Sequence, residues 1–518
     1  MHFFSRRAFL QAGLALTVPA VANARKPASV KPKLFAFEDV IQRARSLAQI
    51  PYQVSQGALP NWLKNLDFDS YRNIRFRPEK AFRASRDNPF RVQLFHPGFL
   101  YQHPVRVNLL QGGIAVPLAY RSNLFDFGNK KQGRSLSAAT GFAGFRLHYP
   151  LNDPAVYDEL ISFLGASYFR FLGRGHQYGL SARGIALHVS NSEREEFPAF
   201  REFWIDSDNA VRGYCAVYAL LDGPSLTGAY QFLIYPDRQT SVDISLVLFL
   251  RRRLDNIGLA PLTSMYFSGE NDPKYTEDFR SELHDSDGLL MHTGAGEWIW
   301  RPLRNPTIKQ VSSFMDNNPR GFGLMQRDRN FGRYQDLEAQ YHKRPAYWVE
   351  PLGKWGAGRV EIVEIPTADE THDNIVSYWC PDSPLEAGQE YSFSYNIKAL
   401  WSSELLHTGG KVVNTFNVPA RASGSNAPSD PLIRRFLIDF AGGDLAFYQD
   451  VSHEIELVPT ATRGEILHTF LVPNKEIQGF RAAIDVRVPH GVATDLRAYL
   501  RYKQAAITET WTLLWAQS

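Results

Sequence analysis

Apolar and polar residues follow two different periods along this chain. Between residues 36 and 50, apolar side chains recur at intervals of three and four: Phe37, Val40, Ile41, Ala44, Leu47 and Ala48. This spacing predicts one amphipathic helix that ends before Pro51. Further along, segments rich in β-branched and aromatic residues, such as GIALHV, YQFLIYP and SVDISLVLFL, alternate with Gly, Pro, Asn and Asp. They predict strands, so we expect an all-β protein with little helix outside residues 36–50.

The C-terminal part repeats this strand pattern at even spacing. Seven strand-like segments, from KVVNTFNVP to ITETWTLLWA, follow residue 410. Short strands at such close intervals are typical of an immunoglobulin-like sandwich. The polar loop WSSELLHTGG precedes them, so we place a boundary between residues 400 and 410. We therefore expect a large sandwich over residues 34–400 and a smaller one over residues 410–516.

Residues 1–24 have the three parts of a removable export signal: a charged start, an apolar run and the small-residue ending ANA. We expect cleavage after Ala24. The pair Arg6 and Arg7, followed by Phe and Leu, is typical of the twin-arginine type, which predicts passage through the twin-arginine translocase into the periplasm. A membrane anchor is the alternative. It is disfavoured because the run is shorter than the roughly 20 residues of a spanning helix and contains Pro19.

Composition and charge narrow the classes of function. The 518 residues are 44% hydrophobic and 21% charged, which is enough for large cores, and the formal net charge of +4 gives no reason to expect a nucleic-acid partner. Cys215 and Cys380 could pair in an oxidising compartment, but one possible bridge is weak support, and we expect two buried free thiols. The sequence has no CxxC pair, Walker loop, HExxH or nucleotide fingerprint, so we expect neither a cofactor nor a metal.

Chemically unusual residues gather between the segments LHDSDGLLMHTGAGEWIWRPL and DETHDNIVSYW. Carboxylates, amides, arginines and large aromatic residues are interleaved there, as a sugar site requires, although polar turns that cap strands would have a similar composition. Cleavage of a glycosidic bond needs one carboxylic acid to protonate the leaving oxygen. It needs a second carboxylate to activate water or attack the anomeric carbon.

Three aspartates fit this requirement. Asp285 and Asp287, in HDSD, are two residues apart and would face the same side of a strand, where crowding or burial could raise the pKa of one of them. Asp373 stands at the head of the predicted strand NIVSYW. Alternatively, HDSD and His292 could hold a divalent cation, but their spacing matches no established metal pattern.

Longer strings identify a family. They include FLGASYFR, YGLSARG, HDSDGL, GEWIWRPL, DNNPRGFGL, KRPAYWVEP and DNIVSYW, in this order. With them the whole mature chain resembles the periplasmic glucan biosynthesis proteins G and D, and its leader makes it more similar to the D member. The resemblance implies a large N-terminal sandwich of the galactose-mutarotase type and an immunoglobulin-like C-terminal domain. It also implies a part in making osmoregulated periplasmic glucans, whose backbone is β-1,2-linked glucose.

Members of this family include inverting glycoside hydrolases that act on β-1,2-glucan. The resemblance implies that Asp373 is the general acid and Asp285 the base, with Tyr341, in YHKRP, beside the reacting sugar. Further expected substrate contacts are His284, Asp287, Tyr347, Trp348 and Glu370. We expect the two catalytic carboxylates to line one cleft, at or beyond the roughly 6.5–9.5 Å usual for inverting pairs.

Three functions remain open at this point. The first is hydrolysis of the β-1,2 backbone, and the second is transglycosylation, in which a sugar hydroxyl replaces water and the product is cyclic or branched. The third is a non-catalytic role as a glucan-binding partner of a membrane glucan synthase, for which aromatic stacking alone would suffice.

The export signal yields a direct prediction. Changing Arg6→Lys together with Arg7→Lys should leave the precursor in the cytoplasm, because the twin-arginine receptor reads that pair. Fractionation of cells that express the variant measures this, and an unchanged periplasmic yield would contradict the assignment.

Overall fold

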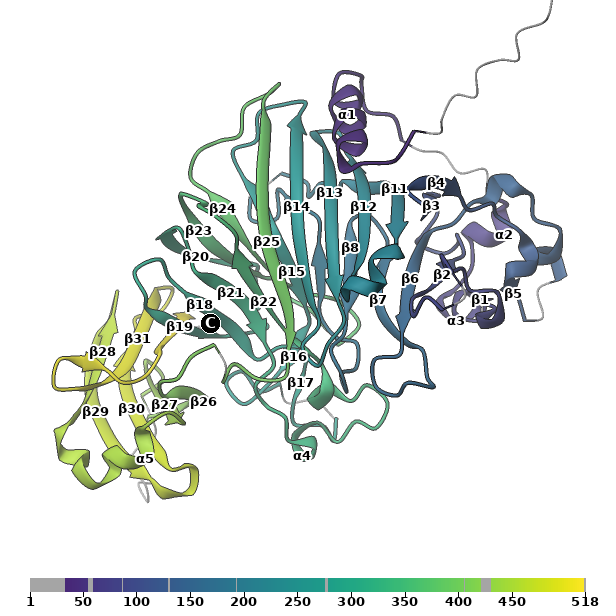
Figure 1. Ribbon diagram of the computed structural model, residues 1–518. Coiled ribbons are helices and arrows are strands. Elements are labelled where there is room, and N and C mark those ends of the chain that lie inside the picture. The colour runs from purple at the N-terminus through teal and green to yellow at the C-terminus, as the bar shows by residue number, and fades with distance from the viewer. Residues whose placement is uncertain are drawn as a thin grey trace, which may run out of the picture.

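The computed structural model describes residues 33–516, apart from residues 55–58, 86, 129–130, 192, 275–277, 405 and 421–429. The predicted signal peptide therefore lies outside the described residues. Within the described part, none of the helices combines the length and the apolar character needed to cross a membrane. Most of this part is built from strands (Figure 1), which confirms the prediction of an all-β sandwich protein.

Two large sheets face each other in the main body (Figure 1). The strands of the first, in spatial order, are β2 (Arg91–Phe95), β6 (Gly144–Tyr149), β7 (Asp158–Leu164), β8 (Tyr168–Phe171), β9 (Ser181–Arg183), β15 (Ile257–Ser264), β24 (Ile375–Pro381), β23 (Ala357–Glu364) and β20 (Gln310–Asn317), with β10 (Ala186–Leu187) beside β15. The second sheet continues through the main body into the C-terminal part of the chain.

The main-body strands of the second sheet, in spatial order, are β19 (Trp298–Pro302), β18 (Gly288–His292), β21 (Gly321–Met325), β22 (Ala346–Pro351), β25 (Glu390–Leu400), β14 (Ser241–Leu250), β13 (Leu226–Tyr235), β12 (Cys215–Asp222), β11 (Ala199–Asp206), β3 (Arg106–Gln111) and β4 (Ile114–Pro117). Two small pairs accompany the large sheets: β1 (Arg75–Phe76) with β5 (Phe125–Asp126), and β16 (Tyr266–Ser268) with β17 (Leu283–His284).

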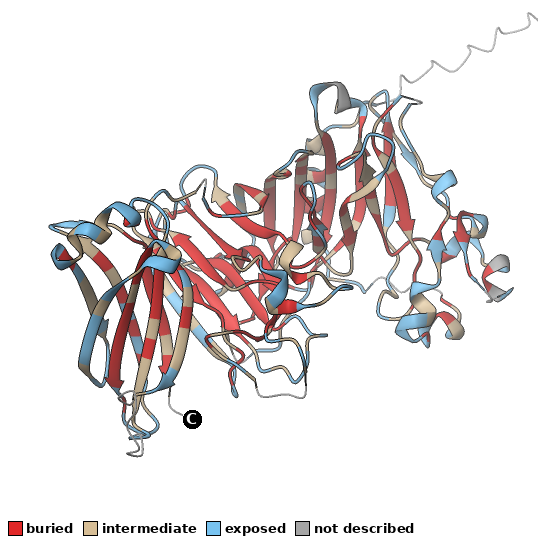
Figure 2. Ribbon diagram, turned by 90° about the horizontal axis from the view of Figure 1, so that it is seen from below, coloured by how far each residue is buried: buried red, intermediate tan, exposed pale blue. Residues whose placement is uncertain are grey.

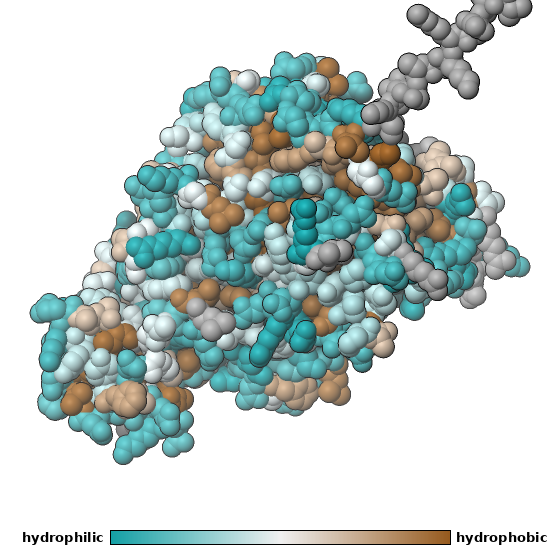
Figure 3. Space-filling model, viewed as in Figure 1, coloured by the Kyte–Doolittle hydropathy of each residue, from teal (hydrophilic) through white to brown (hydrophobic). Residues whose placement is uncertain are grey.

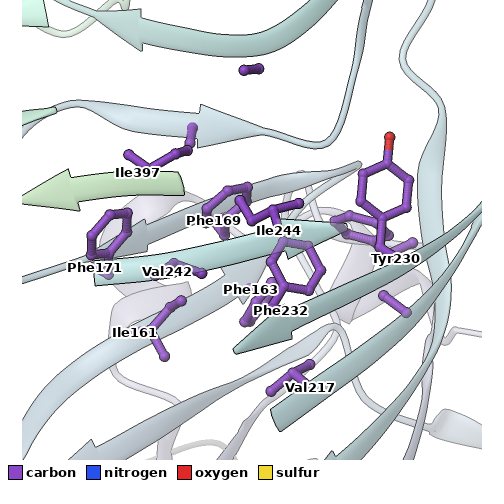
Figure 4. Close-up of a cluster of buried hydrophobic side chains, with 14 of the residues drawn as sticks. Ile161, Phe163, Phe169, Phe171, Val217, Tyr230, Phe232, Val242, Ile244 and Ile397 are labelled. Carbon is purple, nitrogen blue, oxygen red and sulfur yellow. The ribbon is translucent and has the colours of Figure 1, made fainter. Parts of the chain in front are cut away.

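The core of the main body fills the space between the two sheets. Figure 4 shows Phe163 and Phe169 of the first sheet packed against Phe232 and Ile244 of the second. The ring centroid of Phe232 lies 5.2 Å from that of Phe163 and 5.3 Å from that of Phe169. Apolar side chains alternate along β13 and β14 because every second residue of a strand faces the same side. Buried residues accordingly run along the interior strands in Figure 2, and exposed residues lie mainly in loops and at edges.

Helix α1 (Phe37–Ala48) covers the outer face of β12, β13 and β14. It buries Val40 and Ala44 against that face, as its apolar spacing predicts, and it ends before Pro51. The side chain of Asp39 accepts the backbone N–H of Ala36, which satisfies a donor at the free N-terminal end of the helix. The other described α-helices are single turns: α2 (Asn61–Lys64), α3 (Phe68–Arg72), α4 (Phe331–Tyr334) and α5 (Leu445–Tyr448).

The C-terminal strands form a second sandwich that shares a sheet with the main body. One layer is β26 (Lys411–Pro419), β27 (Ile433–Ala441), β30 (Gly479–Arg487) and β29 (Glu465–Asn474). The other is β28 (Ile455–Ala461), β31 (Ala493–Tyr502) and β33 (Thr510–Ala516), with β32 (Ala505–Ala506) beside β31. Strand β33 pairs in parallel with β19, so this second layer continues the large sheet. The boundary between residues 400 and 410 stays a prediction.

Cys215 and Cys380 are free and buried, as expected from the sequence. Burial raises the pKa of the Cys380 thiol to about 11, so this group stays neutral near pH 7.

Phe232→Ala should destabilise the main body by about 3–5 kcal/mol, because it removes a fully buried ring and leaves a cavity among other aromatic rings. The midpoint of urea unfolding, followed by tryptophan fluorescence, measures this. Phe447→Ala is the matched control: its ring is exposed, and we expect a change within about 0.5 kcal/mol. Equal losses in the two variants would contradict the assigned core.

Candidate functional site

The candidate site lies at the end of the main body where Figure 1 shows β16, β17 and α4, the end that faces the viewer in Figure 2. Asp285 directly follows β17, and its backbone N–H donates to the carbonyl of Met265 at 2.8 Å. Tyr341 begins a single 3-10 turn, Tyr341–Lys343, between α4 and β22. Asp373 stands two residues before β24. The predicted site residues therefore come from the small β16–β17 pair, from a 3-10 turn and from the approach to β24 of the first large sheet.

Asp285 forms an ion pair with Arg344. The side chain of Asp285 is only 5% exposed, so its charge requires a close counter-ion. The guanidinium carbon of Arg344 lies 4.0 Å from the ring centroid of Tyr341, which places these two side chains face to face. Burial and the charge of Arg170 lower the pKa of Arg344 to about 10, while Glu370 and Asp373 act in the opposite direction. Arg344 is therefore still cationic near neutral pH.

Glu370 joins Tyr341 to a second arginine. The hydroxyl of Tyr341 donates to Glu370 at 3.1 Å, and Arg280 pairs with the same carboxylate at 3.0 Å. Arg280 also pairs with Asp278 at 2.7 Å and with Asp336 at 2.8 Å. One guanidinium thus connects three loops around the candidate site.

Asp373 is the more accessible of the two predicted catalytic carboxylates. Its side chain is 34% exposed, and one of its oxygens lies 3.9 Å from the guanidinium of Arg170. Direct contacts therefore link Asp285, Arg344, Tyr341 and Glu370, whereas Asp373 contacts a different arginine, Arg170.

His284 lies behind Asp285 and is fully buried. Its Nδ1 contacts the side-chain oxygen of Gln326 at 3.0 Å, and the amide nitrogen of Gln326 donates to the His284 carbonyl at 3.0 Å. This network assigns a proton to Nδ1. Nε2 faces Glu282 at 3.1 Å and Asp287 at 3.5 Å. Burial opposes a charge on the ring, but Asp287 and Glu282 outweigh it and raise the pKa of His284 to about 9.

Among the described residues, Glu282, His284 and Asp287 form a group that could hold a metal, because their ligand atoms lie within 4.8 Å of one another. However, Glu282 already pairs with Arg333 at 2.8 Å, and His284 is held by hydrogen bonds at both ring nitrogens. These contacts suit an imidazolium between two carboxylates. His292 lies outside this group and stacks on Trp298, with centroids 4.0 Å apart, so the alternative of a cation held by HDSD and His292 gains no support.

His284 is closed to a sugar, because it is fully buried and both of its ring nitrogens are hydrogen-bonded. Two other expected substrate contacts are core residues and lie apart from this cluster. Tyr347 is fully buried, its ring stacks on Phe171 at 4.4 Å, and its hydroxyl donates to the Phe171 carbonyl at 2.6 Å. Trp348 points to the opposite face of β22 and packs in the core of the C-terminal sandwich. Neither side chain is open to a sugar, so we leave both out of the candidate site.

A groove of about 860 Å³ lies elsewhere, under α1, near apolar side chains that gather around that helix in Figure 3. The carboxylate in its lining is Asp222, which pairs with Arg251 at 2.8 Å. The arginine Arg43 of α1 pairs with Glu202 at 2.7 Å. These pairs tie the helix to the sheet, whereas the arginines at the other end surround carboxylates that catalysis could use. We therefore take the cluster around Arg344 as the candidate site.

Sequence reasoning missed the arginines of this site. Arg344 and Arg280 belong to loops whose meeting depends on the whole sheet order, and ion pairs with Asp285 and Glu370 leave no periodic pattern. The only signal was the position of Arg344 three residues after Tyr341 in YHKRP.

The fold and the site define an all-β protein of two sandwiches, with a carboxylate–arginine cluster at one end of the larger sandwich. The model of the family described as periplasmic glucan biosynthesis protein, MdoG, matches residues 35–515, and the chain belongs to this family. Its similar proteins include glucans biosynthesis protein G of Shewanella frigidimarina, 43% identical over 93% of this chain and 84% of that protein. Those of Vibrio cholerae (43%, covering 93% and 87%) and Ralstonia nicotianae (42%, covering 97% and 99%) are also similar.

These comparisons correct one expectation. The relatives just named carry the name of the G protein, so they favour the G member over the D member that the twin-arginine pair indicated. Family membership assigns the chain a role in osmoregulated periplasmic glucan biosynthesis.

A further acid, Glu270, acts electrostatically on His284. Burial, reinforced by Glu282 and Asp287, raises the pKa of Glu270 to about 8. The folded protein then holds this proton between about pH 4.5 and 8, where the unfolded chain has released it. Stability falls over that range as the pH rises.

His284 should contribute a further loss of stability on the alkaline side. The unfolded chain releases the His284 proton near pH 6.5, and the folded protein holds it to about pH 9. The stabilisation is therefore complete below pH 6.5 and is lost as the pH rises through 9. His284→Gln should make the fall in unfolding free energy between pH 7 and 9 shallower, by up to about 1.4 kcal/mol per pH unit. Urea unfolding at several pH values measures this.

The control is His453→Gln, which changes an exposed histidine and should leave the pH profile of the wild type intact. Parallel profiles for His284→Gln and the wild type would contradict a charged His284.

Proposed function

We propose that this protein is an inverting glycoside hydrolase that trims the β-1,2-linked backbone of periplasmic glucan. The observation that carries the proposal is the chain of contacts that joins Asp285, Arg344, Tyr341 and Glu370 at one end of the large sandwich. Asp373 pairs with Arg170, and the charges of both act on Arg344. The substrate linkage and the inverting stereochemistry come from the family resemblance.

The different surroundings of the two aspartates support different roles. Asp285 is buried and paired with Arg344, and an adjacent cation favours the carboxylate form that a base needs. Asp373 is more open, so a glycosidic oxygen could reach it. In a single displacement, Asp373 gives its proton to the leaving oxygen while Asp285 accepts a proton from the attacking water. Water then bonds to the anomeric carbon from the face opposite the leaving group.

Tyr341 and Glu370 complete the proposed site. Their mutual hydrogen bond and the pairing of Glu370 with Arg280 fix both side chains without consuming every polar atom. Phenol and carboxylate groups held in this way can bind sugar hydroxyls. We further propose that the protein leaves the cytoplasm through the twin-arginine translocase and acts on glucan that a membrane synthase has made.

One assay separates the three candidate functions. Purified protein is incubated with linear β-1,2-glucan, and the products are resolved by chain length and by cyclisation. Short linear products support hydrolysis. A ring or a new linkage would replace the proposal with transglycosylation, and an unchanged glucan would replace it with a binding role.

Asp373→Asn should lower turnover of β-1,2-glucan by at least about 100-fold, because the leaving oxygen loses its proton donor. Binding of the glucan, measured by calorimetry, should be retained. Asp382→Asn is the matched control, since Asp382 directly follows the same strand, β24, at its other end. Full activity in Asp373→Asn would overturn the assignment of the acid.

A further inference from the structure

The segment Gln326–Asp328, directly after β21, lies between the candidate site and the C-terminal sandwich. On the site side, the buried amide of Gln326 donates to the carbonyl of His284 at 3.0 Å and to that of Tyr341 at 3.2 Å. One side chain therefore holds both the strand end that leads to Asp285 and the turn that carries Tyr341.

The next side chain points the other way. Arg327 binds both oxygens of Glu509, at 2.6 and 3.0 Å, and donates to the carbonyl of Val412 at 2.7 Å. Glu509 precedes β33, is 1% exposed, and also accepts the N–H of Val412 at 2.7 Å. The guanidinium carbon of Arg327 lies 3.5 Å from the ring centroid of Trp300. This guanidinium therefore donates to Val412, in β26, and to Glu509, directly before β33.

The backbone of the segment is fixed as well. Asp287 accepts the N–H groups of Arg327 and Asp328, the latter at 2.9 Å, and it faces His284 at 3.5 Å. Consequently, a shift of Arg327 that strains its backbone acts on a segment that Asp287 and Gln326 connect to His284. From Glu509 to His284 the path consists of one ion pair, one peptide unit and one side chain.

We propose that Glu509 is a positioning residue for the candidate site, and that the C-terminal sandwich thereby forms part of the catalytic framework. This inference rests on the proposed function. Neutralising Glu509 leaves the Arg327 charge without its bidentate partner, which is unfavourable in a largely buried place, so we expect the guanidinium to shift. Reacting groups tolerate little displacement, and a shift of about 1 Å can cost about 100-fold in rate.

The test compares Glu509→Gln with Asp485→Asn. Asp485 forms the same kind of bidentate pair, with Arg435 at 2.7 and 2.8 Å, but within the outer layer of the C-terminal sandwich. Both variants lose one carboxylate of an arginine pair. Only Glu509→Gln removes a partner of the segment Gln326–Asp328.

Glu509→Gln should lower kcat on linear β-1,2-glucan by about tenfold or more while KM changes by less than about threefold. It should also speed amide hydrogen exchange at residues 283–287 and 341–344. Asp485→Asn should leave kcat within about twofold of the wild type and leave exchange in those segments unchanged. Arg327→Lys, which keeps the charge but not the bidentate geometry, should give an intermediate loss and serves if Glu509→Gln does not fold.

Equal losses of kcat in Glu509→Gln and Asp485→Asn would overturn the proposal, since general destabilisation would then explain both. Unchanged exchange at residues 283–287 and 341–344 in Glu509→Gln would overturn it too. If the wild type leaves the glucan unchanged, the proposed function fails by itself. The exchange measurement then still decides whether Glu509 orders these segments.

Discussion

A carboxylate that is removed from water needs a counter-charge, and the arrangement of the candidate site follows from that need. Asp285 is buried at the end of the large sandwich, and its cation comes from Arg344, 59 residues further along the chain. Because Arg344 also lies against Tyr341, the position of that ring depends on the same ion pair. Glu370 and Arg280 extend the arrangement to the surrounding loops. The strand order brings these residues near one another, and the ion pairs then fix their side chains in contact.

The sequence predicted the elements of this fold well where a period repeats. The three-and-four spacing before Pro51 predicted α1, and alternating runs predicted strands, because those patterns record which side of an element meets the core. No periodic pattern in the sequence marks the arginines of the site. Their partners come from other strands and loops, so only the assembled sheet order shows which carboxylate each one meets.

Tyr347 and Trp348 show a different limit. Neighbouring residues on a strand face opposite sides, and in a sheet with one wet face one of the two would be open to a ligand. Strand β22 has both faces covered: Tyr347 enters the core of the main body, and Trp348 enters the core shared with the C-terminal strands. The two consecutive aromatic residues therefore belong to a strand that is buried on both faces. A sugar-binding surface has a similar composition, so the sequence alone did not distinguish the two cases.

The parallel pairing of β19 with β33 has a consequence for how the chain must fold. Glu297, beside β19, accepts the hydroxyl of Thr510 across 213 residues, so this junction is a contact between very distant parts of the sequence. Contacts of that range form slowly, because the intervening loop must first be closed. Until β33 arrives, β19 presents an open edge with the backbone of Ile299 and Trp300 unpaired on that side, and such an edge can recruit strands from other chains. During synthesis, any delay in the arrival of β33 therefore lengthens the time in which the chain is open to aggregation at this edge.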